Sequence, residues 1–271
     1  MPSTTIESGK IEIQYWKDIW KYRELLICLT WRDILVRYKQ TVVGITWALI
    51  RPLLIMLILT LIFGKIAKFS STNIPYPIVV FCGLLPWHFF ASAFTECGNS
   101  LISNSGMISK IYFPRLIIPI SSILTSIIDF LISCILMIIV MLFYNYVPSL
   151  KILFLPIFIA QAFFFAFGAG LWISALMVRY RDFKYIVPFV VQFGLYISPV
   201  GFTSSIIHQE LRFFYSLNPI VGVIDGFRWA IIANESLYLT SVIFSFLGIT
   251  LILITGVYYF RSVERTIADV I

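Results

Sequence analysis

The chain joins a charged segment directly to a long apolar one at residues 31–63, WRDILVRYKQTVVGITWALIRPLLIMLILTLIF. The apolar run covers residues 42–63 and follows the charges without a linker. At about 1.5 Å per residue it forms a helix of roughly 33 Å, which is long enough to cross the hydrocarbon core of a bilayer. The sequence therefore predicts a first transmembrane helix that begins at a basic, aromatic membrane surface.

The composition is that of an integral membrane protein. Hydrophobic residues make up 60% of the 271 residues and charged residues 12%, whereas soluble domains carry about 25% charged residues. No apolar segment precedes residue 42, so we expect no signal peptide. Cys28, Cys82, Cys97 and Cys134 have no metal-ligand spacing and are expected to be reduced thiols.

Residues 15–38 show the pattern of an amphipathic helix. Apolar side chains recur at helical spacing from Tyr15 to Tyr38, and Lys17 and Lys21 occupy another face. We expect a helix, broken near Thr30, that lies in the membrane interface. It is either a simple anchor or a contact for a substrate headgroup or a partner protein. Residues 1–40 are thus expected to form a cytoplasmic N-terminus with an interfacial helix.

Residues 41–271 are predicted to form one transmembrane domain, so the fold class is an all-α integral membrane protein. Six spans are expected, at residues 42–66, 76–101, 116–144, 152–178, 185–202 and 239–260. Residues 203–235 are too polar, and too interrupted by Asn218-Pro219 and Gly222, to cross the membrane. We expect two short re-entrant helices there, which are tolerated where they face protein or water.

Polar groups in three predicted spans indicate contacts with protein. Residues 76–101 end in Glu96, Gly98 and Asn99, so this helix is expected to line a cavity or to pack against protein. Asp129 lies near the middle of the third span, where an ionisable group costs about 2.5–3.5 kcal/mol. An inter-helix hydrogen bond is favoured over a proton relay, because a relay usually needs several acids. On the fourth span, small residues recur every fourth position and predict close helix packing: Ala162, Ala166, Gly170 and Ser174.

The distribution of cations predicts the orientation. Most of the 20 Lys and Arg lie before the first span, in residues 102–115, in residues 179–184 and after the last span. Cytoplasmic segments carry an excess of Lys and Arg, so both termini are expected in the cytoplasm. The net charge of +7 then reflects membrane orientation and gives no reason to expect nucleic-acid binding.

No catalytic motif accompanies these spans. His88 and His208 lie in different segments, so no HExxH metal pair exists. The phosphate-binding pattern GxxxxGK[ST] does not occur in the sequence. We therefore expect no enzyme activity, no metal and no ATP site of this kind in the chain.

Four motifs stand in the order and spacing of one family. They are WRDILVRYKQTVVGITWALIRPLL, SKIYFPRLIIP, VRYRDFKYIVPFVVQFGLYISPV and SLNPIVGVIDGFRWAI. On these residues the chain resembles the transmembrane permease subunit of polysaccharide-exporting ABC transporters, the type-2 class that moves lipid-linked O-antigen. The resemblance covers nearly all of residues 15–265.

The resemblance implies a homodimer with a sugar channel between the protomers. It also implies two copies of a separate ATPase subunit, which bind ATP and Mg, while the permease itself holds no cofactor. The expected cargo is an undecaprenyl-diphosphate type of O-antigen, moved across the bacterial inner membrane to the periplasm. Capsule or teichoic-acid export within the same family is an alternative, and a proton-coupled secondary transporter is another.

Candidate residues follow for four tasks. The family's ATPase-coupling loop corresponds to residues 103–115, with Lys110, Tyr112 and Arg115 as contacts. The turn between the re-entrant helices corresponds to Asn218, Pro219 and Gly222. Cations at the membrane surface are candidates for the lipid diphosphate: Arg51, Arg32, Arg37 and Lys39. Candidates for an aromatic channel wall are Phe189, Gln192, Phe193, Tyr196, Trp87 and Phe90.

Each assignment has a simpler alternative. Arg51 can extend to the headgroups without binding substrate. Lys110 and Arg115 can act only as charges that set the topology. Phenylalanines in spans usually face lipid or the protein core.

Overall fold

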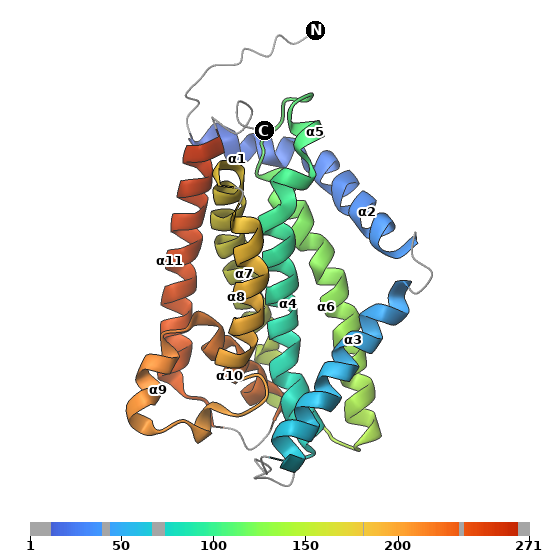
Figure 1. The fold of residues 1–271 in the computed structure, drawn as a ribbon, viewed down its shortest axis with the longest axis vertical. Helices are drawn as coiled ribbons and strands as arrows, with labels where there is room; N and C mark the ends of the chain where they lie inside the picture. The colour runs from blue at the N-terminus through green and yellow to red at the C-terminus, as the bar shows by residue number, and fades with distance from the viewer. Residues whose placement is uncertain (1–11, 40–43, 67–73, 181, 233–235, 265–271) are drawn as a thin grey trace.

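The computed structural model describes residues 12–39, 44–66, 74–180, 182–232 and 236–264, and within these ranges it is helical without strands (Figure 1). The elements are, in order, α1 (Glu12–Lys21), α2 (Arg23–Lys39), α3 (Gly44–Leu59), the π-helix η1 (Thr60–Ile66), α4 (Tyr76–Ser103), α5 (Ser105–Ile108), α6 (Ile117–Phe143), the 3-10 helix η2 (Leu150–Phe154), α7 (Leu155–Arg179), α8 (Phe183–Ile197), the 3-10 helix η3 (Ser204–Ile206), α9 (Gln209–Ser216), α10 (Pro219–Ile231) and α11 (Leu239–Glu264). The predicted all-α class is confirmed.

Five helical segments of the described chain are long and apolar enough to cross a membrane. They are Leu49–Ile66, Tyr76–Ser103, Ile117–Phe143, Leu150–Arg179 and Leu239–Glu264. The predicted fifth span, residues 185–202, is represented by α8, which has only 15 residues. At 1.5 Å per residue α8 measures about 22 Å, against a hydrocarbon core of about 30 Å. Ser198 is extended before Pro199, which ends the helix early, so five such spans stand where six were predicted.

Helices α1 and α2 lie across one end of the bundle (Figure 1). The break between them falls at Tyr22 and not near Thr30, where we expected it. Thr30 stays helical, and its Oγ1 donates a hydrogen bond to the Leu26 carbonyl at 2.8 Å. Tyr15 and Leu26 pack inward, while Trp20 is 72% exposed. The placement of α1 and α2 in the membrane interface stays a prediction.

Helix α4 is the centre of the packing. Among the five candidate spans, 78% of its most apolar window is buried, against 17–33% for the others. It packs against α6, α7, α8 and α10. The small-residue face predicted on the fourth span meets α4, since a Cβ added at Gly170 would lie 2.5 Å from Cys97 Sγ. That prediction is confirmed.

Helices α7 and α11 cross at two glycines. A Cβ at Gly168 would lie 2.7 Å from the Leu253 Cα, and one at Gly256 would lie 2.4 Å from the Gly168 carbonyl oxygen. Neither position can carry a side chain unless the two backbones separate. Apolar side chains gain little by leaving lipid for protein, so close packing of this kind holds membrane helices together.

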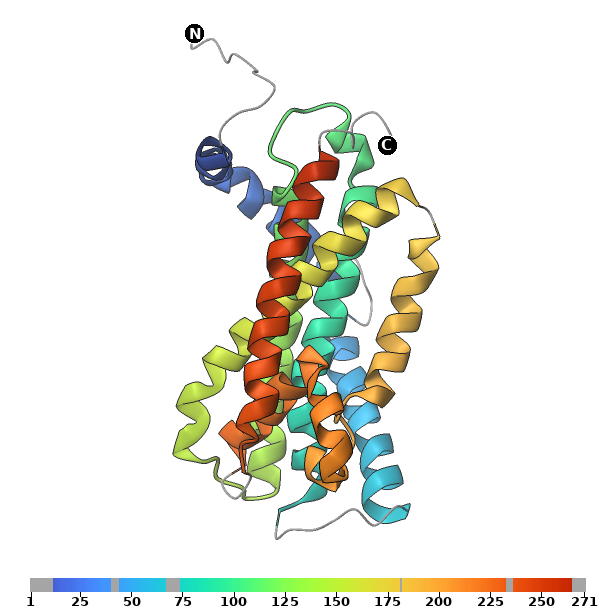
Figure 2. The same ribbon diagram turned by 90° about the vertical axis from the view of Figure 1, so that its left-hand side faces the viewer.

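Residues 203–232 form short helices at the end of the bundle opposite α1 (Figures 1 and 2). Asn218 caps α10, its Oδ1 accepting a hydrogen bond from the Ile220 N–H at 3.3 Å, and Pro219 is the first helical residue. Gly222, which we expected at the turn, lies inside α10. A Cβ there would lie 2.4 Å from the Ser241 carbonyl oxygen, so Gly222 permits close packing of α10 on α11. Residues 233–235 of the predicted re-entrant segment lie outside the described ranges, and insertion of these helices into a membrane stays a prediction.

Substitution of Gly168 by alanine is expected to destabilise the protein by about 1–3 kcal/mol, because the new methyl group meets backbone atoms that cannot rotate away. Thermal unfolding of the detergent-purified protein measures the effect. Gly106→Ala is the matched control, since a Cβ at Gly106 would meet no atom within 4 Å. Equal melting temperatures for the two variants would show that the α7–α11 crossing tolerates extra volume.

Candidate functional site: a charged cluster between α2, α4 and α6

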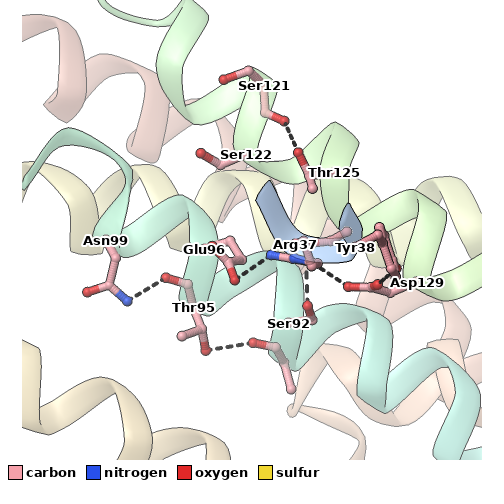
Figure 3. Close-up of polar contacts among 12 residues, drawn as sticks. Arg37, Tyr38, Ser92, Thr95, Glu96, Asn99, Ser121, Ser122, Thr125 and Asp129 are labelled. Carbon is pink, nitrogen blue, oxygen red and sulfur yellow. Dashed lines mark hydrogen bonds and ion pairs between the residues drawn. The ribbon is translucent and has the colours of Figure 1, made fainter. Parts of the chain in front are cut away.

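One face of α4 is polar and only partly buried. Within residues 78–101 every side chain is buried except five, which recur at helical spacing: His88, Ser92, Thr95, Glu96 and Asn99. Two members of this stripe contact neighbouring helices: Glu96 meets α2, and Ser92 Oγ lies 3.4 Å from Ser126 Oγ of α6 (Figure 3). The expectation that this helix packs polar groups against protein is confirmed at Glu96, which is bound by α2.

Arg37 at the C-terminal end of α2 lies between two acids of the spanning helices (Figure 3). Its Nη2 donates to Glu96 Oε1 on α4 at 2.6 Å, and its Nη1 donates to Asp129 Oδ2 on α6. The neighbouring Tyr38 hydroxyl donates to the other oxygen, Asp129 Oδ1. The inter-helix hydrogen bond expected for Asp129 is therefore present. It joins α6 to α2.

The cluster holds two carboxylates and one guanidinium, so its formal charge is −1 when all three groups are ionised. The side chains of Arg37 and Asp129 are 27% and 28% exposed, and that of Glu96 is 45% exposed. Hydrogen bonds to charged groups contribute about 1.5–3 kcal/mol each when they are shielded from water. Burial, together with the Asp129 carboxylate, raises the pKa of Tyr38, so its hydroxyl remains a donor at neutral pH.

Hydroxyl groups of α6 near this cluster are satisfied within their own helix. Ser121 and Ser122 both donate to the Ile118 carbonyl, and Thr125 donates to the Ser121 carbonyl at 3.0 Å. They are therefore not vacant donors for a ligand. In the part of the chain that the structure describes, no three His, Cys, Asp or Glu side chains gather as metal ligands would.

The four diphosphate candidates fall into two groups. Arg37 is held by Glu96 and Asp129, and Arg32 donates to Asp33 at 2.7 Å and to Asn104 Oδ1 at 2.8 Å. Arg32 thus joins α2 to the end of α4, although its side chain is 46% exposed, and Arg37 joins α2 to α4 and α6. Lys39 and Arg51 are exposed. Arg51 lies on α3.

The candidates for a channel wall also divide. Four side chains of α8 lie on its exposed side: Phe189, Gln192, Phe193 and Tyr196. The ring centroids of Phe189 and Phe193 are 4.2 Å apart. Trp87 and Phe90 are instead buried, each 5% exposed, which contradicts a wall position within this chain. Phe90 stacks on Phe165 of α7 at 4.4 Å, and Trp87 packs against Gly194 of α8.

The predicted coupling loop follows α4 and contains α5. Lys110 and Tyr112 are exposed on it, and Tyr112 has an exposed fraction of 72%. Arg115 is bound inside the chain, since its backbone N–H donates to Glu264 Oε1 at 3.0 Å and its guanidinium donates to the Glu264 carbonyl oxygen. Arg115 therefore holds the loop to α11, and an ATPase contact through its side chain is not supported.

Sequence reasoning identified no role for Arg228, which the structure shows to be a buried cation. The side chain is 2% exposed. It donates to the carbonyl oxygens of Val79, Val200 and Phe202 at 3.2, 2.8 and 2.6 Å. The sequence does contain a pattern that predicts this role, a single arginine in the largely apolar stretch IVGVIDGFRWAII. A cation in such a stretch needs hydrogen-bond acceptors inside the protein.

Comparison with known proteins identifies relatives of this chain. A family model described as ABC-2 type transporter matches residues 24–232, which run from α2 to α10 and include the charged cluster. The O-antigen export system permease protein RfbA of Klebsiella pneumoniae is 31% identical over 206 residues, which cover 76% of this chain and 79% of that protein. Another protein with that name and organism is 28% identical over 249 residues, covering 92% and 95%. The polysialic acid transport protein KpsM of Escherichia coli is 24% identical over 205 residues, covering 74% and 78%.

Replacement of Arg37 by leucine is expected to lower the free energy of unfolding by about 1.5–3 kcal/mol, because two carboxylates lose their cation. Thermal unfolding in detergent measures the loss, with Lys39→Leu on the same helix as the exposed control. A triple variant that adds Glu96→Gln and Asp129→Asn should recover most of the stability, since the penalty comes from unpaired charge. A triple variant as unstable as Arg37→Leu alone would contradict this account.

Proposed function

The chain belongs to the ABC-2 type transporter family, and from this membership we propose that it is the permease subunit of an ATP-driven exporter of lipid-linked, O-antigen-type polysaccharide. The observation that carries the proposal is the similarity to the O-antigen export permease RfbA over 92% of the chain. Five helical segments suited to crossing a membrane agree with a multi-pass permease. The cargo is of the undecaprenyl-diphosphate type and moves from the cytoplasm to the periplasm across a bacterial inner membrane.

The energy for export comes from a partner. The sequence lacks the phosphate-binding pattern GxxxxGK[ST], so two copies of a separate ATPase would bind ATP and Mg and act on a permease homodimer. The loop between α4 and α6 offers Lys110 and Tyr112 as exposed contacts. It lies at the same end of the bundle as α1 and the C-terminal end of α11 (Figure 1), the end that the cation distribution predicts to be cytoplasmic.

The glycan requires a hydrated path, and α8 offers one wall of it. Phe189, Phe193 and Tyr196 are 58%, 50% and 67% exposed in the single chain, and α8 stands at the edge of the bundle (Figure 2). Aromatic planes pack against the C–H faces of sugar rings without requiring one hydroxyl pattern, which tolerates sliding. A second copy of the chain would place a matching wall opposite, and Gln192 would supply a polar group between the rings.

Arg51, with Lys39, is the remaining candidate for the lipid diphosphate. Both side chains are exposed; Arg32 is exposed too, but it already bonds to other groups of the chain, as does the partly buried Arg37. An exposed guanidinium on the apolar helix α3 suits a phosphate that enters at the membrane surface. The similarity to the polysialic acid transport protein KpsM supports a polysaccharide other than O-antigen as cargo, and capsule or teichoic-acid export by the same machinery is the second candidate function.

Proteoliposomes that contain the permease and its ATPase are expected to move a lipid-linked glycan only when ATP is supplied. The permease alone should hydrolyse no ATP, because it lacks the phosphate-binding loop. Glycan accessibility to an external lectin measures movement, and collapse of the proton gradient is the control. Movement that needs the gradient and not ATP would assign the chain to the secondary transporters instead.

Replacement of Arg51 by alanine is expected to reduce surface polysaccharide by roughly tenfold, because a charge-assisted contact with phosphate contributes about 1.5–3 kcal/mol. Envelope extracts of the native host measure the polysaccharide, and the amount of permease–ATPase complex should stay unchanged. Lys65→Ala is the control, since Lys65 is an exposed cation at the opposite end of the same helical segment. Unchanged polysaccharide in Arg51→Ala would remove Arg51 from the headgroup site.

A further inference from the structure

One carboxylate at the C-terminal end of α11 joins three parts of the chain. Glu264 Oε1 accepts a hydrogen bond from the Arg115 backbone N–H at 3.0 Å and another from the Tyr15 hydroxyl at 2.8 Å. The Arg115 guanidinium donates to the Glu264 carbonyl oxygen. The loop between α4 and α6, helix α1 and helix α11 therefore meet at this residue.

The surroundings of Glu264 stabilise these hydrogen bonds. Its side chain is 14% exposed, so water competes weakly for the carboxylate. The Arg261 guanidinium lies 3.6 Å from the centre of the Tyr15 ring, and its Nε is 4.0 Å from Glu264 Oε2. Burial, followed by the Glu264 charge, raises the pKa of Tyr15, so the phenol remains a donor at neutral pH.

The loop also packs against α11 through apolar side chains. Ile108 and Phe113 of the loop region are buried in one apolar cluster with Leu171 of α7 and Phe260 of α11. Only the outer side of the loop, with Tyr112, is exposed. These contacts give the loop and the C-terminal end of α11 a shared interior, and close-packed interiors transmit strain.

The opposite end of α11 is joined to α10. Ser245 Oγ accepts a hydrogen bond from the Gly222 N–H at 3.0 Å, and the contact at Ser241 leaves no room for a Cβ on Gly222. Ser245 lies about two turns inside the start of α11, and the helix from there to Glu264 contains no proline and rises about 29 Å. From α10, Arg228 bonds onward to the carbonyl of Val200, three residues beyond the end of α8.

We propose that α11 transmits movement of the loop between α4 and α6 to α10 on the far side of the membrane, with Glu264 and Ser245 as the positioning residues at its two ends. This inference rests on the proposed function, because the ATPase supplies the displacement of the loop. It assigns to α11 a role that is separate from lining the glycan path: it couples nucleotide turnover to the helices at the exit.

Hydrogen–deuterium exchange of the permease–ATPase complex in nanodiscs tests the proposal, with and without ATP plus vanadate. In the wild-type complex, nucleotide should change exchange both in residues 104–116 and in residues 219–231. In Glu264→Ala, which removes the oxygen that accepts from Arg115 and Tyr15, the change in the loop should persist, while the change in α10 falls by roughly 5-fold or more. Export per ATP hydrolysed should fall by a similar factor, whereas a residue needed only for assembly would lower the amount of complex and leave this ratio unchanged.

Ser262→Ala is the matched control, because Ser262 is exposed on the same turn of α11. Ser245→Ala is the second variant, and it should lower the α10 response from the other side of the membrane if Glu264→Ala does not assemble. An α10 response that survives in Ser245→Ala, or in an assembled Glu264→Ala complex, overturns the proposal. A wild-type complex that neither responds to ATP nor exports polysaccharide would contradict the proposed function. The role of α11 in coupling would then be contradicted as well.

Discussion

The pairing of Arg37 with Glu96 and Asp129 is the interaction on which the arrangement of the N-terminal half depends. Two acids on apolar helices need a cation, and lipid offers none. The cation comes from α2, which must therefore lie against both α4 and α6. Arg32 supports the same placement through Asn104 at the end of α4. The basic segment before the first span thus acts largely as a structural element.

A second constraint governs the rest of the bundle, namely close contact between backbones. Gly168 and Gly256 bring α7 and α11 together, and Gly222 brings α10 onto α11. Arg228 completes the far end by donating to the backbone carbonyls of Val200 and Phe202 in the segment that follows α8. Where apolar burial contributes little, such contacts and internal hydrogen bonds determine which helices are neighbours.

The surfaces left unused by this packing are the ones available for transport. Helix α8 presents Phe189, Phe193 and Tyr196, and α3 presents Arg51. The loop between α4 and α6 presents Lys110 and Tyr112, while Arg115 faces inward to α11. Residues that maintain the fold and residues that face partners or cargo therefore alternate within the same short motifs.

The sequence alone determined the helical class, five of the six predicted spans, the small-residue face of α7 and the need of Asp129 for a partner, because hydropathy, periodicity and the cost of burying charge are local properties. It did not determine which cation met that carboxylate, that Trp87 and Phe90 lie in the core, or that α8 ends at 15 residues. Arginines in similar sequence contexts have different environments in the structure: Arg37 and Arg115 bind groups of the chain, whereas the side chain of Arg51 is exposed. Only the tertiary structure decided these points, since partners distant in sequence are chosen by which helices approach one another. That choice depends on contacts such as Gly170 with Cys97, which no single segment encodes.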